Sequence, residues 1–305
     1  MQNQVRQHAF AKVNLCLHIT GRRADGYHEL RTIFQSISLH DTLELERSRE
    51  AGVSFECSDP KLPRGRENLV WRAIEAASAE VGFKDGVRVR LTKRIPVARG
   101  LGGGSSDAAA AMIALLRLSG ARLPLARAME IAAELGADVP FFLVGGRALG
   151  VGRGDEVYPL PDAPKRSMLV VSPHDIGVNT REAYSWLSSE LTKREKAPNM
   201  WGFCALCWSR QEGCASNDFE APVFGRHARL KSIKRALLER GATEAALAGS
   251  GSAVFGVFRS PAQARRAARS FPKDQVFPVE TLPREEYGGF ARTRVNKDGE
   301  LLGRR

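Results

Sequence analysis

The sequence predicts a protein that mixes β-strands with α-helices, in one large or two medium domains. Period-two runs, typical of strands, and apolar stripes at helical spacing follow one another along the chain. A length of 305 residues can bury one large core or two medium ones. The proline-rich segment 159–164 is the best boundary candidate, so we expect domains at residues 1–163 and 164–305.

The first predicted strand covers residues 8–20, where apolar residues at odd positions alternate with Lys12, Asn14, Cys16 and His18. Lys12 and Asn14 therefore share one face, one pleat apart. Taken alone, such residues usually form only the wet face of a strand.

A tight turn is expected at Asp25-Gly26, before a second strand-like run at residues 29–39. Tyr27 and His28 then lie in a loop beside the turn. An aromatic ring next to a hydrogen-bonding ring could stack on a nucleobase and read it.

The sequence around which the chain is organised is Pro96-Val-Ala-Arg-Gly-Leu-Gly-Gly-Gly-Ser-Ser-Asp107, between a strand-like run at 87–95 and an alanine-rich helical run at 108–116. Four glycines in five positions cost backbone entropy, which suggests that backbone N–H groups approach an anion closely. Ser105, Ser106 and Asp107 are good N-cap residues, and a helix start with such a loop predicts a phosphate cradle.

A flexible surface loop is the alternative interpretation of this stretch. Two well-known phosphate motifs do not fit it. The Walker pattern needs lysine after its last glycine, but Ser105 follows Gly104. The dinucleotide pattern needs a third glycine where Ser105 stands.

A single carboxylate, Asp138, stands between a helical run at 125–135 and the apolar run that begins at Pro140. We expect it to be partly buried. It could cap the following helix or serve as a general base, and the residues alone leave both roles open.

Later segments predict a glycine-rich hairpin at 145–155, an amphipathic helix at 230–241 and a glycine bend at 248–256 before an apolar strand. Beyond about residue 284 the chain is basic, and we expect it to be frayed.

Composition excludes several classes of protein. The N-terminus lacks the apolar segment of a signal peptide, and no run approaches the roughly 20 apolar residues that span a bilayer, so we expect a cytoplasmic protein without a membrane partner. Five unevenly spaced cysteines do not suggest a disulfide scaffold. Cys204, Cys207 and Cys214 with His227 could bind zinc, but the run 201–208 is better explained as an apolar packing segment.

The net charge is +12, and residues 226–305 carry 17 Lys/Arg against 8 Asp/Glu. A solvated basic face beside an anionic substrate explains this better than a nucleic-acid partner, because aromatic and basic residues do not interleave as in RNA-binding proteins.

Three motifs together resemble the GHMP kinase superfamily. The sequence Gly-Leu-Gly-Gly-Gly-Ser-Ser at 100–106 resembles its ATP-binding motif, Ala-Lys-Val-Asn-Leu at 11–15 its first motif, and Gly-Ser-Gly-Ser at 249–252 its third. The segment Leu-Gly-Ala-Asp-Val-Pro-Phe-Phe at 135–142 also matches, and Arg-Ala-Asp-Gly-Tyr-His at 23–28 resembles members that act on a cytidine diphosphate polyol. The resemblance covers roughly residues 8–280, with a gap near 190–216.

This resemblance implies an α+β, two-domain GHMP-kinase-like fold with the active site in the cleft. Residues 1–163 would form the ATP-binding domain, and residues 164–305 would close over the substrate. The implied reaction transfers the γ-phosphoryl group of ATP to a hydroxyl of a cytidine diphosphate polyol, in the non-mevalonate route to isoprenoid precursors.

The resemblance also implies roles for individual residues. Lys12 would lie at the reacting phosphate, and Asp138 would be either the base or the orienter of the acceptor hydroxyl. Mg²⁺ would bridge phosphates, with Ser106 as a candidate ligand. The ATP-binding residues would be Pro96, Val97, Ala98, Arg99, Gly100, Leu101, Gly102, Gly103, Gly104, Ser105 and Ser106.

On the substrate side, Asn14 would lie near the acceptor, Tyr27 and His28 would hold the cytosine, and Phe34 would complete an aromatic wall. Asn179 aligns where some members carry an aromatic on the far side of the base, and Gly249 and Gly251 would abut the phosphates and acceptor. Family members often have small residues at 98–99, so Arg99 would either contact a phosphate or face solvent.

Two other functions remain as alternatives. One is a GHMP kinase that acts on a base-free polyol or amino alcohol, against which Tyr27 and His28 argue. The other is a basic RNA-binding module, against which the combination of Lys12, the glycine-rich loop and Asp138 argues.

Overall fold

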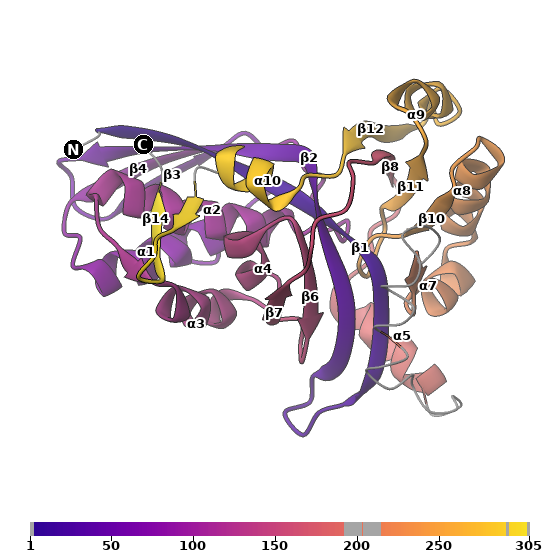
Figure 1. Cartoon of the computed structure of the whole chain (residues 1–305), viewed down its shortest axis with the longest axis horizontal. Helices are drawn as coiled ribbons and strands as arrows, with labels where there is room; N and C mark the ends of the chain where they lie inside the picture. Colours follow the sequence, from indigo (N-terminus) through magenta and orange to yellow (C-terminus); the bar gives the residue numbers. More distant parts are fainter. Residues whose placement is uncertain (1–2, 192–202, 204–214, 291–292, 304–305) are drawn as a thin grey trace.

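Two long antiparallel strands, β1 (Gln4–Arg22) and β2 (His28–Ser48), run through the molecule (Figure 1). They belong to a computed structural model that describes residues 3–191, 203, 215–290 and 293–303. The turn predicted at Asp25-Gly26 is confirmed: Gly26 has a φ of 86°, and the Asp25 carboxylate accepts a hydrogen bond from Tyr27 N at 3.0 Å. Register shifts along the pair bend both strands, so that their far ends leave the main sheet (Figure 1).

The first sheet has the strand order β3-β4-β2-β1-β9, with β6 paired to β2 and β7 paired to β6. The hairpin predicted at 145–155 is present as β6 and β7, but its second strand begins only after residue 155. The bounds are β3 Val53–Cys57, β4 Gly86–Thr92, β6 Arg147–Val151, β7 Glu156–Pro159 and β9 Ser216–Asn217.

Four helices gather on one side of this sheet (Figure 1). The alanine-rich run forms α2, which is buried at every position from Ser106 to Leu118 and packs against both α1 and β1. Small alanine side chains allow this close approach from all sides. The bounds are α1 Leu69–Val81, α2 Gly103–Ser119, α3 Leu125–Leu135 and α4 Val139–Val144.

The second sheet has the order β10-β11-β8-β12. Strand β8 is buried at all seven positions, which is expected when both faces of a sheet are covered. The bounds are β8 Ser167–Pro173, β10 Glu244–Leu247, β11 Val254–Phe258 and β12 Asp274–Glu280, with helices α5 Thr180–Leu191, α7 Glu220–Arg226, α8 Ala228–Glu239 and α9 Pro261–Ala268.

One apolar cluster joins the two sheets. Ala11 and Val13 on β1 and Leu101 of the glycine-rich loop pack with Val170 and Phe255 of the second sheet. A polar contact holds β1 beside the chain that follows β9: the imidazole of His18 on β1 lies 3.3 Å from the Asp218 carboxylate. Hydrogen bonding to Asp218 raises the pKa of His18 to about 10, so the imidazole is protonated at neutral pH.

The C-terminal tail differs from the expectation of a frayed end. Helix α10 (Arg284–Phe290) is followed by β13 (Thr293–Val295) and β14 (Glu300–Gly303), and β14 pairs with β5 (Leu123–Pro124). The hydroxyl of Tyr287 donates to the carbonyl of Phe142 at 2.6 Å, and Leu301 is fully buried in the core around α2. The tail was expected to lie with the second domain, but it returns to the first half of the chain (Figure 1). Apolar residues at two points were enough to anchor it despite its charge.

The cysteines of the zinc alternative, Cys204, Cys207 and Cys214, lie outside the described residues. The described part of the chain contains no group of three or more His, Cys, Asp or Glu side chains that could hold a metal. Phe203, from the run expected to pack, is buried beside Cys16 and Ile33. In the same described ranges, no helix is long and apolar enough to cross a membrane.

Replacing the anchor Leu301→Ala should lower the free energy of unfolding by about 2–5 kcal/mol, because it leaves a cavity in the core around α2. Urea unfolding followed by circular dichroism measures this. Val295→Ala, in the same tail but 44% exposed, is the matched control and should change stability by less than about 0.5 kcal/mol. Equal effects of the two changes would show that the tail is not anchored through Leu301.

Candidate active site

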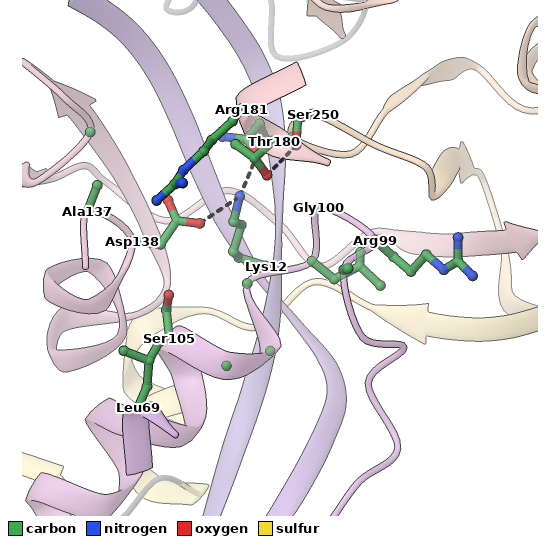
Figure 2. Close-up of a pocket in the computed structure, with 18 of the residues that line it drawn as sticks. Lys12, Leu69, Arg99, Gly100, Ser105, Ala137, Asp138, Thr180, Arg181 and Ser250 are labelled. Carbon is green, nitrogen blue, oxygen red and sulfur yellow. Dashed lines mark hydrogen bonds and ion pairs between the residues drawn. The ribbon is translucent and has the colours of Figure 1, made fainter. Parts of the chain in front are cut away.

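A cavity of about 1010 Å³ lies where the two sheets meet. Its lining comes from β1 and β2, the glycine-rich loop and the start of α2, the start of α5, and the bend between β10 and β11. Figure 2 shows Lys12 and Asp138 turned toward one another within it, with Thr180 and Ser250 above Lys12 and the side chain of Arg181 reaching toward Asp138.

The glycine-rich loop leads directly into α2, but the cap differs from the prediction. Helix α2 begins at Gly103 and its N-cap is Gly102, with a φ of 71°, so Ser105, Ser106 and Asp107 lie inside the helix rather than before it. A side chain at Gly102 would lie 2.7 Å from the ring of Phe142, so only glycine fits there. The N–H groups of the first turn have no partner within the helix, and they give this end of the cavity a partial positive charge.

The predicted ATP-binding residues from Pro96 to Ser105 all line the cavity, but Ser106 does not. Ser106 is 2% exposed and its N–H already bonds to Gly102 O at 2.9 Å. Its hydroxyl therefore does not face the space in which a nucleotide or metal would bind.

A second glycine bend packs backbone against backbone on this loop. A Cβ at Gly100 would stand 1.8 Å from the carbonyl oxygen of Ala248, and one at Gly249 would stand 2.9 Å from Gly100 O. Gly249 and Ser250 line the cavity, whereas Gly251 is turned toward Leu247 outside the lining. The glycines are needed here because no side chain fits between the two loops.

Arg99 takes neither of the two positions expected for it. Its guanidinium donates to Ser252 Oγ at 2.7 Å and to the carbonyl of His174 at 3.3 Å, and in Figure 2 it points away from Lys12. Arg99 thus ties the glycine-rich loop to the second sheet. Its pKa is lowered, because the side chain is partly buried.

The Lys12–Asp138 pair lies at the centre of the site. Lys12 is only 3% exposed, so the alternative of a wet strand face is wrong; its Nζ lies 3.3 Å from Asp138 Oδ2 and donates to Asn14 Oδ1 at 2.9 Å. Asn14 in turn donates to Thr32 Oγ1 at 2.7 Å, which fixes the direction of the lysine. Asp138 occupies the N-cap position of α4 but makes no capping bond with its side chain. Its carboxylate is therefore available to a hydroxyl in the cavity.

Three rings face the far end of the cavity. Tyr27 is 57% exposed, with the guanidinium of Arg153 5.1 Å from its ring centre, and His28 stacks on Tyr184 at 4.7 Å. Burial, with the nearby charge of Arg22, lowers the pKa of His28, so the imidazole is neutral at pH 7 and can both donate and accept a hydrogen bond.

Phe34 and Asn179 lie differently from the base-binding positions expected for them. Phe34 is 1% exposed and packs against the tilted ring of Phe141 beneath Lys12, so it forms the floor rather than an open wall. Asn179 is outside the lining, and its side-chain oxygen accepts from Arg181 N at 2.9 Å at the start of α5. Tyr184, one helical turn later, does line the cavity.

Sequence reasoning also missed a buried ionic group beside the start of α2. Lys93 Nζ lies 2.5 Å from Asp41 and 2.7 Å from Asp107, while the second oxygen of Asp107 has no hydrogen-bond partner. Burial raises the pKa of Asp107. Asn68 and Lys93 line the same part of the cavity. The signal for this group was weak, because the three charged residues are far apart in the sequence.

A glycine-rich helix start with unpaired N–H groups, next to a lysine–carboxylate pair, is an arrangement suited to a phosphotransferase of the GHMP class. The family models "GHMP kinases N terminal domain" and "GHMP kinases C terminal" match residues 68–146 and 205–275. Three solved structures share the fold of this chain over more than 90% of its length: a mevalonate kinase from L. major in complex with R-mevalonate (TM-score 0.70, 16% identity), a homoserine kinase from Cytophaga hutchinsonii (0.67, 20%), and a 4-(cytidine 5'-diphospho)-2C-methyl-D-erythritol kinase (0.77, 37%).

Curated relatives narrow the class. A 4-diphosphocytidyl-2-C-methyl-D-erythritol kinase of Solibacter usitatus is 43% identical over 95% of this chain and 92% of its own length. The same enzyme of Pelotomaculum thermopropionicum is 39% identical over 90% of this chain and 96% of its own. The chain belongs to the 4-diphosphocytidyl-2-C-methyl-D-erythritol kinase family and is thus an ATP-dependent phosphotransferase with an alcohol acceptor. This membership favours the kinase interpretation over the RNA-binding alternative.

Replacing Gly100→Ala should lower the thermal unfolding midpoint by several degrees, because the new Cβ would clash with Ala248 O and the φ of 77° is strained for alanine. Differential scanning calorimetry measures this. Gly104→Ala is the matched control: its Cβ would meet nothing closer than 3.9 Å, and alanine favours a helix by about 1 kcal/mol over glycine. If both variants unfold at the same temperature, the contact between the two loops does not constrain the fold.

Proposed function

We propose that this chain transfers the γ-phosphoryl group of ATP to the 2-hydroxyl of 4-diphosphocytidyl-2-C-methyl-D-erythritol, giving the 2-phosphate and ADP for isoprenoid precursor biosynthesis. The observation that carries the proposal is that one cavity contains both a phosphate cradle and a ring cluster, with the Lys12–Asp138 pair between them. The names of the curated relatives support the choice of substrate. Because the reaction consumes ATP, we assign it to the cytoplasm.

The ATP phosphates would bind to the N–H groups of the glycine-rich loop and the first turn of α2. The nucleoside would extend toward Asn68 and Lys93, which line this part of the cavity.

The cytosine of the acceptor would pack among Tyr27, His28 and Tyr184. A neutral His28 offers one donor and one acceptor, which suits the polar edge of cytosine. Tyr184, which stacks on His28, would supply the aromatic ring that the resemblance implies at position 179.

Catalysis would consist mainly of positioning and charge neutralisation. The acceptor oxygen attacks the γ-phosphorus, the bond from that phosphorus to the β-bridging oxygen breaks, and ADP leaves. Lys12 neutralises charge on the phosphoryl group and holds Asp138 toward the hydroxyl. Asp138 has two possible roles that both fit the geometry. It either takes the proton of the acceptor hydroxyl as a base, or it orients that hydroxyl, which then loses its proton late in the transfer.

The carboxylates that line the cavity are those of Glu67, Asp107 and Asp138, and the last two are already paired with lysines. Mg²⁺ would therefore be held mainly by phosphate oxygens and water. Ser105, whose side chain lines the cavity, is a better candidate ligand than the buried Ser106. The ion would neutralise the charge of the phosphates.

Replacing Asp138→Asn should lower kcat by roughly a hundredfold or more, because the amide cannot accept the proton. The measurement is ADP release with Mg·ATP and the diphosphocytidyl substrate, with the native protein alongside. Equal turnover would keep the kinase assignment but remove Asp138 as an essential base. No turnover by the native protein, with ATP still bound, would point to a different acceptor.

Replacing Tyr184→Ala should raise KM for the diphosphocytidyl substrate by about ten- to a hundredfold, because stacking on a base is worth roughly 1–3 kcal/mol. KM for ATP should change little. Asn179→Ala is the matched control from the same segment, and it should leave both KM values within about threefold because its side chain only caps α5. If Asn179→Ala raised KM for the diphosphocytidyl substrate more than Tyr184→Ala did, position 179 would be the one that contacts the base, as the resemblance implies.

A further inference from the structure

One cation in the cavity comes from the second half of the chain and faces the Lys12–Asp138 pair. Arg181 is the second residue of α5, and its side chain lines the cavity. In Figure 2 it extends from the start of α5 toward Asp138.

Most of the other cations that line the cavity already have fixed partners. Lys12 pairs with Asp138, Lys93 with Asp41 and Asp107, and Arg153 with Asp155 at 2.5 Å. Arg99 is held by Ser252 and the carbonyl of His174.

Two lining arginines, Arg22 and Arg181, form no ion pair with any residue that the structure describes. Arg22 lies at the ring end of the cavity, since its charge helps to lower the pKa of His28. Arg181 is therefore the unpaired cation directed at the point where phosphoryl transfer would occur.

The backbone that carries Arg181 is well fixed. Asn179 Oδ1 accepts from Arg181 N at 2.9 Å, and Thr180 Oγ1 lies 3.0 Å from Ser250 Oγ in the second glycine bend. Ala183, on the next part of the helix, is fully buried. A long side chain on a fixed helix start can reach into the cavity without moving the backbone.

We propose that Arg181 binds the phosphoryl group during its transfer and is a catalytic residue contributed by the second half of the chain. This rests on the proposed kinase function. In the transition state, charge spreads over the three equatorial oxygens of the phosphoryl group, and a guanidinium can donate to two of them at once. Lys12 on β1 and Arg181 on α5 would then neutralise that group together, one from each half of the chain.

The test is steady-state kinetics of the native protein, Arg181→Ala and Arg181→Lys with Mg·ATP and the diphosphocytidyl substrate. We expect Arg181→Ala to lower kcat about a hundredfold or more, with both KM values within about threefold. Arg181→Lys should recover only part of kcat, because it keeps the charge but loses the two-point contact. Arg22→Ala is the matched control and should mainly raise KM for the diphosphocytidyl substrate.

The proposal would be overturned if the native protein is active and Arg181→Ala has the same kcat. A rise in the acceptor KM alone would also overturn it, because it would assign Arg181 to the diphosphate of the acceptor.

A second measurement separates this inference from the proposed function. Aluminium fluoride with Mg·ADP mimics the phosphoryl group in transfer, and its binding needs no particular acceptor. Isothermal titration should show that aluminium fluoride tightens ADP binding in the native protein and much less in Arg181→Ala, with ADP alone bound equally by both. Equal tightening would overturn the role of Arg181 even if the acceptor proved to be another alcohol.

Discussion

The close approach of two glycine-containing loops is the contact on which the site depends. Gly100 leaves room for the carbonyl of Ala248, so the glycine-rich loop of one half rests directly on the bend of the other. The same approach brings Leu101 into the apolar cluster between the two sheets and leaves Gly249 and Ser250 at the cavity. A side chain at Gly100 would separate the halves and open the site to water, which would weaken each electrostatic interaction within it.

Burial of charge is the second constraint. Lys12 and Lys93 are almost wholly removed from water, and each is paired with one or two carboxylates. A buried ammonium without such partners would lose its proton or destabilise the fold. Two of these carboxylates, Asp107 and Asp138, also line the cavity, so the charge pairing that the buried lysines require brings acidic groups to the site.

Long-range connections hold these parts in place. The β1 strand carries Lys12 in the first sheet and His18 in contact with Asp218. The C-terminal tail crosses back to the core behind α2, and Tyr287 binds the carbonyl of Phe142 in α4, directly after Asp138. The segment that carries Asp138 is thus supported by a residue almost 150 positions away.

The sequence by itself determined the features that are encoded locally. Strand alternation put Lys12 and Asn14 on one face, glycine density marked the phosphate cradle, and the resemblance of short motifs predicted the α+β GHMP-kinase-like fold. Only the tertiary structure decided which residues meet across the cavity. It made Gly102 rather than a serine the cap of α2 and turned Arg99 toward Ser252. It also put Tyr184 instead of Asn179 at the rings and directed Arg181 toward Asp138. The physical reason is that periodicity and turn chemistry act over a few residues. These contacts instead depend on how two sheets, formed by distant parts of the chain, pack together.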